Sequence, residues 1–179
     1  MTNAMALSRE RLDLLETLRV HRGFLRTTAD ALTDEQARQR STVSKLTIGG
    51  IIKHVAQTEQ GWAQFMTGAG LPGGDVEVDW SNPAPAVIEA YENGFKLLAG
   101  ETLASALAEY EAVAAATDDL VARLPDLDAE YPLPAAPWFP PGASRSVRRA
   151  IMHIVAETAQ HAGHADIVRE AIDGRKTMG

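Results

Sequence analysis

Apolar residues recur at every third or fourth position along four long segments of the 179-residue chain, and this spacing constrains the fold most strongly. The pattern is clearest over residues 103–124. It places the apolar side chains on one face of an α-helix and is typical of helices in bundles. Thr102 is a candidate N-cap, and Pro125 would end the helix. The apolar face consists of Leu103, Leu107, Tyr110, Ala114, Thr117, Val121 and Leu124.

Three further segments predict helices of the same kind, at about residues 8–32, 48–66 and 145–173. Thr47 precedes the middle one as a candidate N-cap, and Gly174 follows the last one at the position where glycine commonly ends a helix. Four amphipathic helices joined by two long connections predict an all-α four-helix bundle that forms a single domain over residues 1–179.

The remaining segments carry weaker signals. The leucine stripe of the first segment ends at Leu32, and residues 33–36 then match a capping box, which predicts a short helix there. Residues 86–91 are compatible with one or two helical turns. A sheet has little support, because aromatic residues make up only 6% of the chain and no apolar alternation is apparent.

Charge and cysteine content exclude several classes of protein. Lys and Arg number 17 against 24 Asp and Glu, a net charge of −7, which argues against binding of nucleic acid. The absence of cysteine excludes a disulfide scaffold, an iron–sulfur centre and a cysteine nucleophile. No segment is long and apolar enough to suggest a membrane span, and residues 1–11 lack a signal pattern, so we expect a cytoplasmic protein without membrane partners. Any metal ligands must come from His, Asp and Glu.

Histidine and glutamate side chains gather on one face of the last helix. His153, Glu157 and His161 follow one another at intervals of four, and the helical rotation places His161 almost inside the apolar stripe, with Glu157 at its edge. His54 lies at the corresponding edge of the helix over residues 48–66. Three donors on two helices are able to hold a divalent metal. The alternative is a local Glu157–His161 ion pair with His54 as an ordinary boundary residue.

Two other charged features allow both a structural and a functional interpretation. Glu59 falls within an apolar stripe, so it needs either a partner, for which His21 and Arg22 are candidates, or a catalytic purpose.

Three arginines, at positions 145, 148 and 149, crowd the start of the last helix. Either Arg145, Arg148 and Arg149 pair with neighbouring carboxylates, or they form a cationic rim that attracts an anionic substrate. Residues 68–73 fit the pattern G-x-G-x-x-G, but they follow a helix rather than a strand, so we interpret them as a loop.

Two segments, Leu46–Glu59 and Glu157–Asp166, resemble the DinB-like superfamily of metal-binding four-helix bundles, and the second is similar to the branch near the mycothiol-dependent maleylpyruvate isomerases. The resemblance implies an up-down-down-up bundle that binds a divalent metal, zinc or nickel above all. It implies His54, Glu157 and His161 as the ligands. Many members of the superfamily have histidine at the position of Glu157, whereas the isomerase branch has glutamate.

The resemblance also implies an activity. Three protein ligands leave an open coordination position, and the expected guest is a low-molecular-weight thiol that attacks an electrophilic substrate, in S-transfer or isomerisation. His164 and Glu59 are the catalytic candidates, and Arg145 and Arg148 are candidates for binding the cofactor. A metal-dependent hydrolase and a non-catalytic metal-binding or stress-related interaction module are the alternatives. Dimerisation through spare apolar helix surface is a further expectation.

Overall fold

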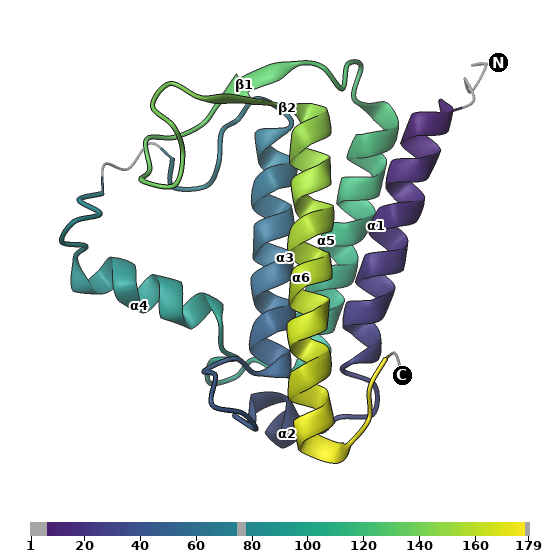
Figure 1. The fold of residues 1–179 in the computed structure, drawn as a ribbon, viewed down its shortest axis with the longest axis vertical. Coiled ribbons are helices and arrows are strands. Elements are labelled where there is room, and N and C mark those ends of the chain that lie inside the picture. Colours follow the sequence, from purple (N-terminus) through teal and green to yellow (C-terminus); the bar gives the residue numbers. More distant parts are fainter. Residues whose placement is uncertain (1–6, 75–77, 178–179) are drawn as a thin grey trace.

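The computed structural model describes residues 7–74 and 78–177, and four long helices run side by side through it (Figure 1). They are α1 (Arg9–Thr27), α3 (Ile48–Phe65), α5 (Leu103–Arg123) and α6 (Val147–Asp173). In Figure 1, α1 and α6 descend while α3 and α5 ascend, so the chain crosses from the end of α3 to the start of the parallel helix α5. The predicted all-α bundle with up-down-down-up topology is confirmed.

The helix ends follow the side chains that cap them. Thr47 and Thr102 accept hydrogen bonds from the backbone N–H groups of Gly50 and Ser105, as predicted for N-caps. Gly174 ends α6 in the left-handed conformation with φ 77°, also as predicted. The start of α6 differs by two residues, because Ser146 is its N-cap.

The first helix ends five residues before the predicted position. The Thr28 hydroxyl donates back to the Leu25 carbonyl, and Ala31 adopts a left-handed conformation with φ 60°, which ends the helical path. Leu32 nevertheless packs against the core from the turn that follows. The leucine stripe therefore continues in space beyond the helix. The capping box at Thr33 begins α2 (Asp34–Arg38), as predicted.

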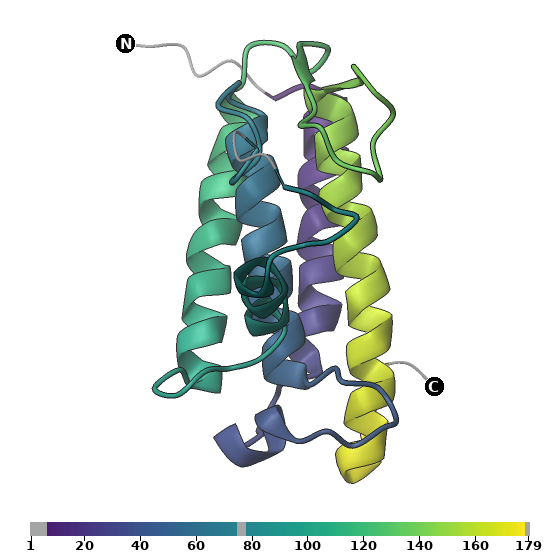
Figure 2. The same ribbon diagram turned by 90° about the vertical axis from the view of Figure 1, so that its left-hand side faces the viewer.

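Both predicted long connections contain regular structure. The first holds α4 (Pro85–Gly94), which is longer than the one or two turns expected and has no buried residue. The second holds β1 (Glu130–Pro132) and β2 (Ser144–Ser146), an antiparallel pair with Tyr131 opposite Arg145. The sequence offered little support for a sheet, and three-residue strands are too short to show an alternating pattern. Figure 2 shows α4 almost end-on, outside the four long helices.

The core lies where the long helices face one another, with the closest packing between α1 and α6, α3 and α5, and α3 and α6. Its largest fully buried side chains include Tyr110, Phe65, Leu18 and Leu25. Within the described residues, no helix combines the length and the hydropathy needed to cross a membrane.

Two adjacent glycines bring the end of the first long connection against α3. A Cβ atom on Gly49 would lie 2.4 Å from Leu97 Cδ1, and one on Gly50 would lie 2.0 Å from the Phe95 carbonyl oxygen. Because glycine has no Cβ atom at these two positions, the segment that follows α4 packs directly against the backbone of α3. The contact holds Phe95 in place beside the first turns of α3.

Candidate metal centre

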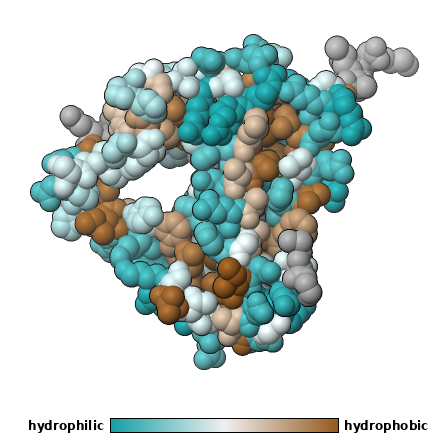
Figure 3. All heavy atoms as spheres, viewed as in Figure 1, coloured by the Kyte–Doolittle hydropathy of each residue, from teal (hydrophilic) through white to brown (hydrophobic). Residues whose placement is uncertain are grey.

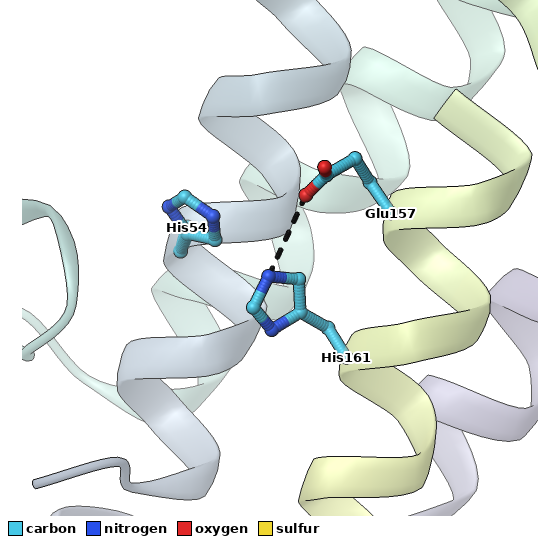
Figure 4. A group of neighbouring side chains, drawn as sticks. All are labelled: His54, Glu157 and His161. Atoms are coloured by element: carbon cyan, nitrogen blue, oxygen red, sulfur yellow. Dashed lines mark ion pairs between the residues drawn. The ribbon is translucent and has the colours of Figure 1, made fainter. Parts of the chain in front are cut away.

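Three side chains from two facing helices converge at mid-height in the bundle. His54 extends from α3, and Glu157 and His161 extend from α6 toward it (Figure 4). One ligand atom from each lies within 4.8 Å of the other two. The structure thus brings together the three residues that the sequence and the family resemblance had singled out.

Glu157 is the anionic member of the cluster. Its two carboxylate oxygens lie 3.6 Å from His161 Nε2 and 3.6 Å from His153 Nε2, one turn away on either side. A hydrogen bond from His161 lowers the pKa of Glu157, against the opposing effect of burial. The carboxylate is therefore ionised at neutral pH and offers a negative oxygen ligand.

His54 is neutral at pH 7. Burial, reinforced by the neighbouring His161, lowers its pKa to about 4, and the attraction of Glu157 offsets only part of this. A neutral imidazole keeps a nitrogen lone pair free for a metal ion. The Phe95 ring stacks on the His54 ring at 3.9 Å with an angle of 21° between the planes, which fixes the orientation of the imidazole.

The donor set fits a divalent metal. Two imidazole nitrogens and one carboxylate oxygen are a typical three-ligand combination for zinc in catalytic sites. Bonds of about 2.0–2.1 Å in a tetrahedron would bring the ligand atoms to roughly 3.4 Å from one another, so the cluster would contract modestly on loading. His161 Nδ1 is buried without a hydrogen-bond partner among the described residues, while His161 Nε2 faces the Glu157 carboxylate.

The cluster opens onto a large cavity. His54 and Glu157 form part of the wall of a space of about 1000 Å³, which the bundle bounds on one side and α4 on the other. Figure 3 shows the molecule hollowed between these two parts. Most of the wall is apolar, and it includes all three tryptophans of the chain, Trp62, Trp80 and Trp138. A small molecule that enters this space would contact His54 and Glu157 directly.

The two catalytic candidates lie elsewhere. Glu59 is 1% exposed and accepts two hydrogen bonds from Arg22, at 2.5 and 3.2 Å, so its partner is the arginine rather than His21. His164 lies one turn beyond His161, with the two rings edge-on and 5.5 Å apart. Neither residue lines the cavity within the described chain.

The arginines at the start of α6 separate into two groups. Arg148 pairs with Glu10 and Asp128 and does not contribute to the described cavity wall. Arg145 does contribute, and its guanidinium lies over the rings of Trp62 and Phe139.

The cavity wall also includes a histidine beside the proposed ligand cluster. His153 lines the cavity, packs edge-on against Trp62 at 4.7 Å, and has a pKa lowered chiefly by burial. Its place one turn before Glu157 was visible in the spacing. What the spacing did not show is that loops 71–74 and 134–139 leave this turn of α6 facing an open space. Residues 68–73 form a loop, as predicted, and residues 71–73 of this loop line the cavity.

Comparisons with known proteins identify a family and a similar fold. Residues 13–174 match the profile of the mycothiol-S-transferase family. A crystal structure of a conserved protein from Enterococcus faecalis superposes with a TM-score of 0.65 over 95% of this chain and 100% of that one, at 14% sequence identity, which supports the fold alone. No curated protein matches the sequence significantly.

Proposed function

The chain belongs to the mycothiol S-transferase family, within the DinB-like superfamily that its sequence resembles, and from this premise we propose that it is a metal-dependent thiol S-transferase or isomerase. The observation that carries the proposal is the convergence of His54, Glu157 and His161 beside a cavity that His54 and Glu157 line. The cavity is large enough for a small thiol and its electrophilic partner.

The three ligands would hold a divalent ion, zinc or nickel, with a net charge of about +1 after the Glu157 carboxylate is counted. When bound, such an ion lowers the pKa of a thiol and so supplies a thiolate nucleophile at neutral pH. The chain has no cysteine, so the sulfur must come from the low-molecular-weight thiol.

The protein's own side chains would bind and deprotonate that thiol. His153 Nε2 lies at the cavity wall beside the ligand cluster, and we assign it as the acceptor of the thiol proton. The apolar wall excludes water from the thiolate, which preserves its reactivity toward an electrophile. A reducing cytoplasm is the compartment in which such a thiol persists.

Metal content tests the site. We expect about one zinc or nickel ion per chain in protein purified without a tag or chelator, and an affinity at least about 100-fold lower in His161→Ala, because even an outer partner of a metal ligand is worth 10- to 100-fold. His21→Ala is the matched control, since His21 lies on α1 away from the cluster. A wild-type protein without metal, or a His161→Ala protein that keeps it, would overturn the assignment.

Thiol conjugation tests the reaction. Monochlorobimane should be conjugated to mycothiol by the metal-loaded protein, and more slowly to glutathione. His153→Gln should weaken metal binding by no more than about 10- to 100-fold, because His153 contacts the proposed ligand Glu157. At saturating metal the variant should conjugate the thiol more slowly than the wild type, because the proposed proton acceptor is lost. Conjugation at the same rate with and without metal would contradict the metal-dependent mechanism. Conjugation that fails with every thiol would favour the non-catalytic alternative. Hydrolysis of an ester in the absence of thiol would instead favour a hydrolase.

A further inference from the structure

The positively charged side chain of Arg145 lies at the end of the cavity away from the ligand cluster. Arg145 comes at the end of the hairpin, one residue before the N-cap of α6. Its guanidinium carbon is 5.0 Å from the centre of the Trp62 ring and 5.2 Å from that of Phe139. Its Nη1 atom is buried and has no hydrogen-bond partner in the described parts of the chain.

This arginine differs from the others that are buried to a comparable or greater degree. Arg22, Arg26, Arg148 and Arg169 each contact at least one carboxylate, and Arg11 donates to two backbone carbonyls. Arg145 has neither kind of partner among residues 7–74 and 78–177. Burial lowers the pKa of Arg145, and the neighbouring charge of Arg149 lowers it further. The aromatic rings stabilise the cation but leave its N–H donors unused. A partly desolvated guanidinium of this kind is complementary to an anion.

The two ends of the cavity are connected by a continuous wall. From Arg145 the wall passes to Trp62, whose ring is 4.7 Å from that of His153, and His153 in turn lies 3.6 Å from the Glu157 carboxylate. Because a helix rises 1.5 Å per residue, the stretch from residue 147 to residue 157 spans about 15 Å, and the reach of the arginine side chain reduces the separation to on the order of 10 Å.

We propose that Arg145 binds an anionic group of the ligand whose reacting atom lies at the His54–Glu157–His161 end. The ligand class is an elongated molecule with an apolar middle and a carboxylate or similar anion on the order of 10 Å from the reacting atom, the spacing that the helix rise sets. The proposal rests on the proposed function only for the chemistry at the metal end. Either the thiol or the electrophile supplies the anion.

Tryptophan fluorescence provides a direct binding measurement, because all three tryptophans line the cavity. The ligands are 8-mercaptooctanoate and 8-mercaptooctanamide, which differ only in the charge at the end opposite the sulfur. Wild-type protein should bind the acid at least about 10-fold more tightly than the amide, as expected for a partly buried charged hydrogen bond. Arg145→Gln should reduce this preference to less than about twofold.

Arg149→Gln is the matched control. It removes the same charge from the next turn of α6, but Arg149 is exposed and is not part of the described cavity wall, so the preference for the acid should persist. Arg145→Lys keeps the charge without the planar fork and should retain part of the preference. It also tests the proposal if Arg145→Gln does not fold. Equal binding of acid and amide by the wild type, or an undiminished preference in Arg145→Gln, overturns the proposal.

Conjugation kinetics identify the source of the anion. If Arg145→Gln raises the KM for 8-bromooctanoate but not for 8-bromooctanamide at fixed mycothiol, the electrophile carries it. If the variant raises the KM for 8-mercaptooctanoate at fixed monochlorobimane, the thiol does. No change in either KM contradicts the proposal. Because the acid preference is measured by fluorescence without turnover, its failure is distinguishable from a failure of metal binding or of thiol conjugation.

Discussion

Partial burial lowers the pKa of His54 to about 4. The stability of the metal-free protein should therefore depend on pH. Between pH 6.5 and 4 the unfolded chain binds a proton at this residue that the folded chain does not. The free energy of unfolding should therefore be highest above pH 6.5 and fall as the pH is lowered through this window. Because His54 is only partly buried, solvent screening keeps the loss attributable to it below the roughly 3 kcal/mol that the full shift in pKa implies.

Chemical denaturation of chelator-treated wild type and His54→Gln at pH 7.5, 5.5 and 4.5 measures this effect. Wild type should lose more stability than the variant over the same range. The pKa of His153 is lowered in both proteins, so its contribution largely cancels, and the lowered pKa of Glu157 acts below pH 4.5. Equal pH slopes in the two proteins would show that His54 is not held in the neutral form by the fold.

Glu59 is expected to act on stability rather than on catalysis. Arg22 donates to it at 2.5 and 3.2 Å and also to Asp118 at 2.7 Å, and both Arg22 and Glu59 are buried. Glu59→Leu leaves the buried cation with a single acid and should cost about 3–5 kcal/mol. Glu59→Gln keeps an acceptor oxygen and should cost about 1–2 kcal/mol less than that.

Urea denaturation of the two variants, and of the double variant Arg22→Leu/Glu59→Leu, measures the difference. Removal of both charges should recover much of the loss, because no unpaired ion remains in the core. A ranking in which the leucine variant is the more stable would contradict a buried ion pair at this position.

At the level of elements, the close approach of the chain after α4 to α3 depends on Gly50. An alanine Cβ there would lie 2.0 Å from the Phe95 carbonyl oxygen, so the backbone of residue 95 must move and its ring must shift from His54. Gly50→Ala should destabilise the protein by about 1–3 kcal/mol, as overpacking generally does. It should also weaken metal binding, because the imidazole loses its stacked neighbour.

Gly163→Ala is the matched control for this substitution. Gly163 lies within α6, and its Cβ would meet no atom within 4 Å. Alanine there should stabilise the helix by about 0.5–1 kcal/mol. Thermal denaturation and metal titration of both variants provide the test, and a tolerated Gly50→Ala with unchanged metal affinity would contradict the packing described.

The elements differ in how far the sequence predicted them. Helices α3 and α5 begin at the residues predicted because a threonine cap precedes a long apolar stripe in each case. The predicted end of α1 was wrong, because Leu32 keeps the helical spacing of the leucine stripe but lies in a turn. The convergence of His54, Glu157 and His161 was predictable from their spacing and from the family resemblance, and their role as metal ligands stays a prediction. That Arg145 and His153 line one cavity could not be predicted, because it depends on the course of two long loops. Apolar periodicity does not encode that course.

For the whole molecule, stability should be unevenly distributed, because α4 has no buried residue whereas each of the four long helices has several. We expect backbone amides of Pro85–Gly94 to exchange with solvent at least about 100-fold faster than those of Ile48–Phe65. Hydrogen–deuterium exchange followed by mass spectrometry measures both segments in one experiment.

A ligand in the cavity should slow that exchange, since Ala86, Val87 and Ala90 of α4 form part of the wall. Saturation with 8-mercaptooctanoate provides the comparison, and exchange in α2, which contributes no described residue to that cavity, is the internal control. Exchange of α4 as slow as that of α3 in the free protein would contradict this distribution of stability.

The three proposed metal ligands come from α3 and α6, and His54 and Glu157 are about 100 residues apart in the sequence. An ion held by both helices would join the two ends of a loop that contains α4, α5 and the hairpin, and would thereby act as a reversible cross-link on the chain. Ions that bind only the folded state raise its population by mass action. The free energy of unfolding would then rise with the concentration of free metal, so a cell short of metal would hold a less stable protein as well as one without its ion.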